Sequence, residues 1–271
     1  MSRIEKTFAQ LREKEEGALI MYIPVGYPNL EISESLIRAI AESGADIIEL
    51  GVPYADPLAD GPTIQEACLQ AVNNGTNLDI CLETVSKLRA SGIDTPIVFM
   101  GYCNSFLAYG LERLAVQAVE AGVDGFIIPD LPSTMAQPWV QKFEPHGLDL
   151  IFFLAPTTSE ERAAAVVKQG SGFLYCISVA GVTGVRQSLP DELPGFIQQI
   201  RKQSTLPLAV GFGISNEQHV KEVSGYADGA IVGSALIQII KQASPETVEQ
   251  DVRAFVHQLK NATRSVAAER V

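Results

Sequence analysis

Short apolar runs alternate with longer amphipathic segments from one end of the chain to the other. The apolar runs predict buried strands, at residues 19–24, 47–51, 97–101, 125–129, 149–155, 173–178, 208–211 and 229–232. The amphipathic segments predict helices, at residues 33–43, 63–73, 78–91, 111–121, 135–145, 159–169, 193–203, 216–224 and 245–262. A further stripe of Ile4, Phe8 and Leu11 predicts an extra N-terminal helix that ends near Gly17.

Three of the turns between a helix and the next strand share one pattern. Residues 44–48, 122–127 and 226–231 each place a small residue and an Asp directly before a strand. Strands that alternate with helices through short turns form a parallel sheet, and eight such units close into a barrel. An open, doubly wound sheet is the alternative, but no GxGxxG motif follows the first strand. We therefore expect one domain over residues 1–271, an α/β (β/α)8 TIM barrel with an extra N-terminal helix.

The composition agrees with this expectation and limits the classes of molecule that the chain can bind. The chain has 271 residues, of which 46% are hydrophobic, a length that suits a barrel of about 250 residues. Its formal net charge is −12, and the basic residues form no cluster, which disfavours nucleic acid and anionic membrane surfaces as partners. The four cysteines form no CxxC pair, and no apolar run resembles a leader or a membrane span. We expect a cytoplasmic protein with reduced thiols.

Two carboxylates stand out because of where they lie. Glu49 interrupts the apolar run 47–51, and Asp60 lies in the proline-rich loop that follows it. Carboxylates that differ in burial differ in pKa, as acid–base chemistry near neutral pH requires. The alternative is a structural Glu bound by backbone donors beside a solvated turn. Residues at the ends of barrel strands are commonly catalytic, so the pattern favours chemistry.

Glycine-rich segments follow the last three predicted strands. They are residues 181–184, Gly211-Phe212-Gly213 and Gly233-Ser234. Glycines allow backbone N–H groups to approach an anion, and a helix that starts at Ser234 directs its positive end to the same place. We expect Ser234 to act both as helix N-cap and as a phosphate ligand. Glycines after strands can also be plain turn formers, but three in succession favour a phosphate site.

The other strand ends are apolar or aromatic, namely Tyr22, Met100, Tyr102, Ile127, Phe153, Tyr175 and Phe212. Each alone fits core packing, but together at one end of a barrel they would line a pocket for a flat apolar group. None of the three histidines and no lysine lies at the end of a predicted strand. This disfavours a metal site and a Schiff-base lysine. A carboxylate mechanism on an aromatic sugar phosphate remains.

Residues 49–53 (ELGVP) and 56–62 (DPLADGP) resemble the signature of the tryptophan synthase α-subunit family. The resemblance continues through residues 128–132, 180–184, 211–214 and 233–235, and it spans the whole chain. It implies a lyase of tryptophan biosynthesis that cleaves indole-3-glycerol phosphate to indole and glyceraldehyde 3-phosphate, without a cofactor in this chain.

The resemblance also implies roles for individual residues. Glu49 would shuttle the proton, Asp60 would stabilise the charged indole ring, and Tyr175 would supply an auxiliary hydroxyl. Thr183 would hold Asp60 when loops 53–60 and 179–189 close as a lid. Residues implied to bind the phosphate are Gly184, Phe212, Gly213, Gly233 and Ser234.

The partner implied by the resemblance is a β subunit that carries pyridoxal phosphate, in an α2β2 assembly. Positions on the family's contact face are Asp56, Pro57, Asn104 and Pro132. Tyr54-Ala55 and Ser133-Thr134 depart from the family's usual residues near that face. Two alternatives are a stand-alone lyase that releases indole and a non-catalytic barrel that only binds a partner.

Overall fold

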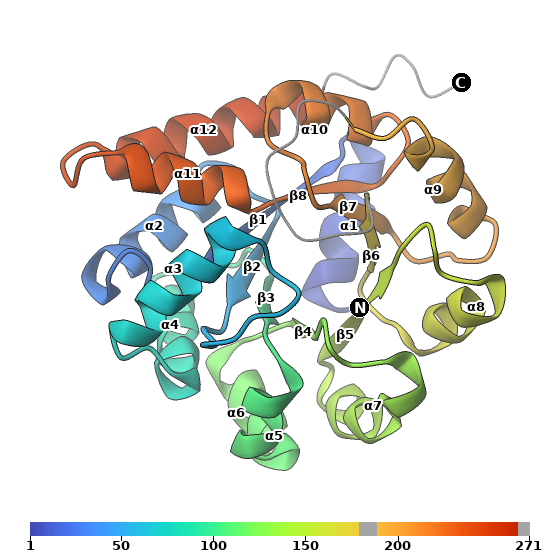
Figure 1. Ribbon diagram of the computed structural model, residues 1–271, viewed down its shortest axis with the longest axis horizontal. Helices are drawn as coiled ribbons and strands as arrows, with labels where there is room; N and C mark the ends of the chain where they lie inside the picture. The colour runs from blue at the N-terminus through green and yellow to red at the C-terminus, as the bar shows by residue number, and fades with distance from the viewer. Residues whose placement is uncertain (179–188, 265–271) are drawn as a thin grey trace.

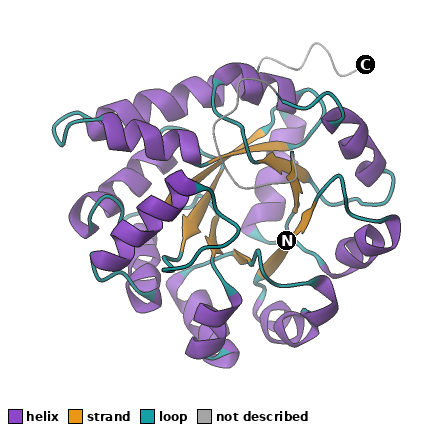
Figure 2. Ribbon diagram, in the orientation of Figure 1, coloured by secondary structure: helices purple, strands orange, loops and turns teal. Residues whose placement is uncertain are grey.

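Eight parallel strands close into a barrel surrounded by helices (Figures 1 and 2). The computed structural model describes residues 1–178 and 189–264. Each strand pairs in parallel with the next, and β8 pairs with β1. The strands are β1 (Ala18–Pro24), β2 (Ile47–Gly51), β3 (Ile97–Met100), β4 (Gly125–Ile127), β5 (Asp149–Leu154), β6 (Leu174–Ile177), β7 (Leu208–Gly211) and β8 (Gly229–Val232).

The helices lie outside the strands, apart from α1 (Arg3–Glu13) (Figure 1). The helices that follow α1 in the first half of the chain are α2 (Leu30–Glu42), α3 (Pro62–Asn73), α4 (Leu78–Ala90), α5 (Cys103–Tyr109) and α6 (Leu111–Ala121). The later ones are α7 (Gln137–Phe143), α8 (Glu160–Gln169), α9 (Leu193–Arg201), α10 (Glu217–Ser224), α11 (Ser234–Gln242) and α12 (Val248–Thr263). Short 3-10 turns, η1 (Ser133–Met135) and η2 (Glu144–His146), flank α7.

The predicted barrel is confirmed, and every strand boundary lies within two residues of its expected place. Helix α1 ends at Glu13 rather than near Gly17, and two other helical regions differ from the expectation. Helix α5 was not predicted, and the helix expected over residues 135–145 is divided into η1, α7 and η2. No helix in the described part of the chain is long and apolar enough to cross a membrane.

Side chains on each strand alternate between two cores. On β1, Ile20 and Tyr22 belong to the cluster inside the barrel, whereas Leu19 and Met21 belong to the cluster between the barrel and the helices. This alternation follows from the two-residue period of a strand. The same alternation turns Glu49 of β2 inward, because it is in register with Tyr22.

Helix α1 closes the N-terminal end of the barrel. Its apolar residues Ile4, Phe8 and Leu11 belong to the same buried cluster as the inward side chains of the strands, and Phe8 lies 5.9 Å from the ring of Phe173. Ser2 caps the helix together with Glu5 in a reciprocal capping box. With the N-terminal end filled, a cavity can open only at the other end, where the strands reach their C-termini.

Aspartates at three helix-to-strand turns stabilise the N-terminal end of the barrel through hydrogen bonds. Each carboxylate accepts a hydrogen bond from the backbone N–H of a residue near the start of the preceding strand, and its own N–H returns one to the same residue. The pairs are Asp46 with Leu19, Asp124 with Ile97 and Asp228 with Leu208, at 2.7–2.9 Å. The Asp that recurs in the sequence before strands therefore binds neighbouring strands to each other.

Candidate active site

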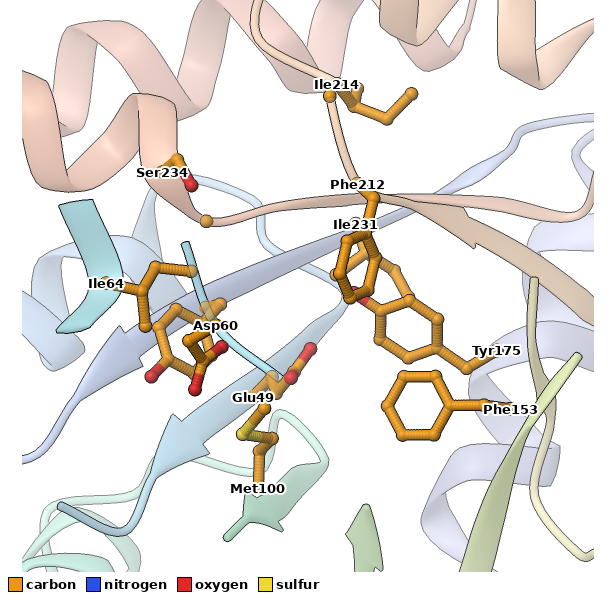
Figure 3. Close-up of a pocket in the computed structure, with 13 residues that line it drawn as sticks. Glu49, Asp60, Ile64, Met100, Phe153, Tyr175, Phe212, Ile214, Ile231 and Ser234 are labelled. Atoms are coloured by element: carbon orange, nitrogen blue, oxygen red, sulfur yellow. The ribbon is translucent and has the colours of Figure 1, made fainter. Parts of the chain in front are cut away.

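A cavity opens at the C-terminal ends of the strands (Figure 3). It encloses about 510 Å³ of space, including its open mouth. Strands β1, β2, β3, β5, β6 and β8 and the segments after β2, β7 and β8 supply its walls. The lining residues are Tyr22, Glu49, Asp60, Ile64, Met100, Phe153, Tyr175, Phe212, Gly213, Ile214, Ile231, Gly233 and Ser234. The predicted carboxylates therefore share one cavity with most of the predicted aromatic residues and with the glycine-rich segments after β7 and β8.

Glu49 extends from β2 into this cavity and is only 2% exposed. Among the described residues, its Oε2 atom has no hydrogen-bond partner. Burial, with a smaller contribution from the charge of Asp60, raises the pKa of Glu49 from 4.5 to about 8. At neutral pH the side chain is thus a carboxylic acid that can donate a proton into the cavity.

Asp60 lies just before α3 and is also only 2% exposed. The hydroxyl of Tyr102 donates to its Oδ2 atom at 2.7 Å, and Gln65 donates to its backbone carbonyl at 2.8 Å. Burial raises the pKa of Asp60 to about 6, while the hydrogen bond from Tyr102 opposes that rise. Between about pH 6 and pH 8 an ionised Asp60 therefore faces a protonated Glu49, the arrangement that acid–base chemistry needs.

An aromatic wall faces the two carboxylates (Figure 3). The ring of Tyr175 lies 4.6 Å from that of Phe153 and 5.9 Å from that of Phe212. Gly211 makes room for Tyr175, because a Cβ atom at that position would lie 2.3 Å from the tyrosine hydroxyl oxygen. This wall suits a flat apolar ring.

Phe212 adopts an uncommon backbone conformation with φ of +69°. Non-glycine residues rarely occupy this left-handed region, and they do so mainly where the surroundings hold them there for function. The hydroxyl of Ser178 donates to the carbonyl of Phe212 and secures the bend. The bend places Phe212 in the cavity wall, beside Gly213.

Backbone N–H groups at one side of the cavity can donate hydrogen bonds to an anion. Gly233 and Ser234 lie at the start of α11, whose positive end is directed to the cavity, and Gly213 has φ of +90°. The lining includes no Lys or Arg among the described residues. The expectation that Ser234 caps the helix was wrong, because Gly233 occupies the cap position and Ser234 is the first helical residue.

Three residues expected in the binding wall do not line the cavity. Ile127 is fully buried in the barrel interior, Tyr102 contacts Asp60 from outside the cavity, and Gly211 lies behind Tyr175. Thr183 and Gly184 lie outside the described residues.

Three isoleucines in the wall were missed from the sequence. Ile231 could have been found from the alternation on β8, because residues 229 and 231 point to the opposite side of the strand from residues 230 and 232. Ile64 in the first turn of α3 and Ile214 after Gly213 belong to a helix and a loop. Strand periodicity carries no signal for residues in such segments.

The positions expected on a partner face lie in the segments that follow β2, β3 and β4, with Asn104 in helix α5. Asp56, Asn104 and Pro132 are exposed, but Pro57 is buried and does not form part of the outer surface.

Among the described residues, no group of three His, Cys, Asp or Glu side chains is arranged to hold a metal ion.

Known protein sequences match almost the whole chain. The family profile described as tryptophan synthase alpha chain matches residues 8–264. The tryptophan synthase alpha chain of Roseiflexus sp. strain RS-1 is 50% identical over 260 residues, 96% of this chain and 100% of that relative. That of Chloroflexus aggregans is 46% identical over 266 residues, 98% of this chain and 100% of that relative.

Solved structures give the same result. The alpha subunit of tryptophan synthase from Legionella pneumophila superposes with a TM-score of 0.90 at 38% identity, covering 97% of this chain and 98% of that chain. A chain of Mycobacterium tuberculosis tryptophan synthase also has a TM-score of 0.90, at 37% identity and the same coverage. By sequence and by fold, this chain belongs to the tryptophan synthase alpha chain family.

Proposed function

We propose that the chain is the α subunit of tryptophan synthase and cleaves indole-3-glycerol phosphate to indole and glyceraldehyde 3-phosphate. The observation that carries this proposal is the pairing of two buried carboxyl groups with opposite protonation in one cavity. An aromatic wall for indole and a helix start for phosphate lie in that same cavity.

The reaction needs one proton to move from oxygen to carbon. Glu49, as the acid, gives its proton to C3 of the indole ring, which becomes positively charged. Ionised Asp60 accepts the ring N–H and stabilises that charge. The carboxylate of Glu49 then takes the proton of the hydroxyl on the carbon bonded to C3. That carbon becomes the aldehyde, the C–C bond breaks, and its electrons return to the ring as indole leaves.

The phosphate binds at the opposite side of the substrate from the ring. Backbone N–H groups of Gly213, Gly233 and Ser234 hold it at the positive end of α11. Tyr175 supports the substrate from the aromatic wall, and Thr183 and Gly184 contribute from outside the described residues. The chain uses no cofactor of its own in this scheme, because both proton transfers go through Glu49.

A β subunit is the partner, as the family implies, and we propose an α2β2 assembly in which β carries pyridoxal phosphate. The exposed face near the cavity supports this. Leu58, Leu107 and Met135 are 77%, 53% and 66% exposed and lie in or near the loops after β2, β3 and β4. Apolar side chains exposed together are typical of a surface that a partner covers, and Asp56, Asn104 and Pro132 extend the same face.

The direct test measures indole release from indole-3-glycerol phosphate by the wild-type chain and by Asp60→Asn, each with and without a β subunit. We expect wild-type release to rise when β is added, and Asp60→Asn to lower turnover about 100- to 1000-fold in both conditions. Steady wild-type release that β does not change would favour the stand-alone lyase. No release in any condition would favour the non-catalytic barrel.

A further inference from the structure

Tyr102 contacts Asp60 without entering the cavity. It follows β3 and takes the cap position of α5. Its hydroxyl donates to Oδ2 of Asp60 at 2.7 Å and accepts the backbone N–H of Ala59 at 3.1 Å. Its ring stacks on Tyr54, with centroids 5.4 Å apart. One hydroxyl thus binds both the carboxylate and the loop backbone next to it, and the stacked ring restricts its movement.

The other groups around Asp60 do not stabilise its negative charge in this way. Glu49 of β2 is acidic, and no Lys or Arg in residues 1–178 or 189–264 forms an ion pair with Asp60. Burial raises the pKa values of Tyr22 on β1 and Tyr175 on β6, and raises that of the Cys68 thiol on α3 to about 12. The charge of Asp60 further disfavours ionisation of these three groups, which stay neutral near pH 7 and so carry no positive charge that could pair with the carboxylate.

We propose that Tyr102 is a positioning residue for the cleavage reaction, because its hydroxyl fixes the orientation of the Asp60 carboxylate and stabilises its charge. Oδ2 is bound by Tyr102, which leaves Oδ1 for the N–H of the indole ring. This inference rests on the proposed role of Asp60. Tyr102 itself need not touch the substrate, which agrees with its absence from the cavity wall.

The test is Tyr102→Phe, which keeps the ring and its stacking but removes the hydroxyl. A hydrogen bond to a charged group of this kind corresponds to a loss in turnover of about 10- to 100-fold. We expect kcat to fall by that amount near pH 6 while KM changes by less than about threefold. The acidic limb of the kcat profile should move to higher pH by about one unit, since the lost hydrogen bond favoured the ionised form of Asp60.

Tyr54→Phe is the matched control, because it removes a hydroxyl from the other ring of the same stack. Its acidic limb should coincide with that of the wild type. A double variant, Tyr102→Phe with Asp60→Asn, should be no slower than Asp60→Asn alone, because the hydroxyl acts through the carboxylate.

Each other outcome identifies what is wrong. If Asp60→Asn is inactive but Tyr102→Phe matches the wild type, the inference fails and the proposed function stands. If Asp60→Asn keeps full turnover, the role of Asp60 fails and the inference fails with it. If Tyr102→Phe raises KM and lowers the rate equally at every pH, Tyr102 only supports the loop and the positioning role is overturned.

Discussion

At the scale of single residues, the burial of Glu49 lowers the free energy of unfolding by an amount that depends on pH and that unfolding measurements can detect. Its pKa is about 8 in the folded chain and near 4.5 when exposed. Between these values the folded state keeps a proton that the unfolded state has already released. The contribution of Glu49 to stability therefore decreases as the pH rises from about 4.5 to about 8, and it is constant above that range.

Glu49→Gln should for this reason stabilise the fold, and more so in alkali. The amide keeps the shape of the side chain and has no charged form. We expect the gain in the free energy of unfolding to be up to about 4 kcal/mol larger near pH 9 than near pH 5. Urea unfolding of both proteins at the two pH values measures it. An equal gain at both would mean that Glu49 is ionised in the folded protein at neutral pH.

The residue scale also shows where sequence reasoning ends. Glu49 was identifiable because a charge inside an apolar strand is rare unless something requires it. The true position of Tyr102 could not be predicted, since its contact with Asp60 depends on how loop 52–61 folds back over the strand ends. The burial of Pro57 depends on the same loop. It could not be predicted, because a loop has no periodic pattern of apolar residues.

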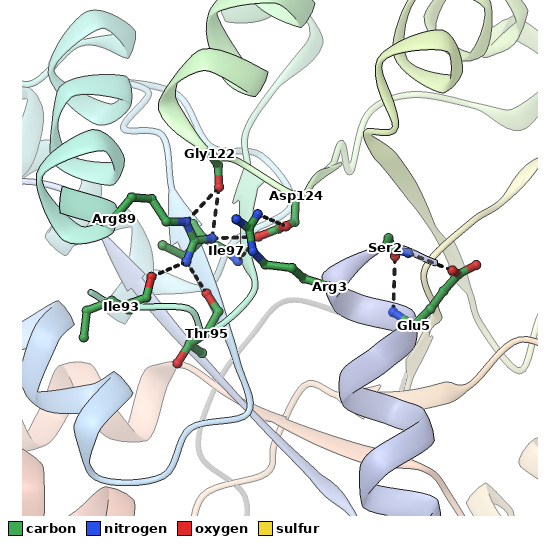
Figure 4. Close-up of polar contacts among 9 residues, drawn as sticks. All are labelled: Ser2, Arg3, Glu5, Arg89, Ile93, Thr95, Ile97, Gly122 and Asp124. Carbon is green, nitrogen blue, oxygen red and sulfur yellow. Dashed lines mark hydrogen bonds and ion pairs between the residues drawn. The ribbon is translucent and has the colours of Figure 1, made fainter. Parts of the chain in front are cut away.

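At the scale of elements, an aspartate and two arginines join β3, β4 and the N-terminal helix (Figure 4). Asp124 accepts from Arg89 at 2.8 Å and from Arg3 at 3.0 Å, as well as from the N–H of Ile97. Arg89 also donates to the carbonyl groups of Ile93 and Thr95. This network lies at the closed end of the barrel, away from the cavity.

Asp124→Ala should destabilise the fold without affecting chemistry. It leaves the partly buried Arg89 without its carboxylate and the N–H of Ile97 without its side-chain acceptor, so we expect a loss of about 3–5 kcal/mol. Urea unfolding tests the loss, and kcat should stay within about twofold of the wild type. Glu83→Ala breaks an exposed pair on α4 and should cost below about 1 kcal/mol. Equal losses in the two variants would show that the network adds no more than a surface ion pair.

Elements with regular periodicity were predictable, and those fixed by other segments were not. The eight strands were found because each is buried on both faces and follows a turn with its own signal. Helix α5 was missed because its N-cap residue makes no side-chain hydrogen bond to the first turn of the helix. Instead, Asp130 of a neighbouring loop accepts a hydrogen bond from the N–H of Cys103 at 2.9 Å. A contact across 27 residues leaves no local pattern in the sequence.

At the scale of the whole molecule, α1 fills one end of the barrel and the reaction is confined to the other. The exposed apolar side chains near that open end, Leu58, Leu107 and Met135, place the proposed partner face beside the cavity. Indole would therefore be released close to the partner that consumes it. The strand order was predictable from the alternating pattern, whereas the cavity wall depends on loops and helix starts that only the folded chain brings together.

The measurement that tests the central claim most directly is the pH dependence of kcat/KM for indole release from indole-3-glycerol phosphate, for the wild type and for Glu49→Gln. Cleavage requires ionised Asp60 and protonated Glu49 in the free enzyme, so kcat/KM should fall below about pH 6 and above about pH 8. Glu49→Gln should release no measurable indole at any pH. A wild-type rate that keeps rising through pH 9, or turnover by Glu49→Gln above about 1% of wild type, would contradict the carboxylate mechanism.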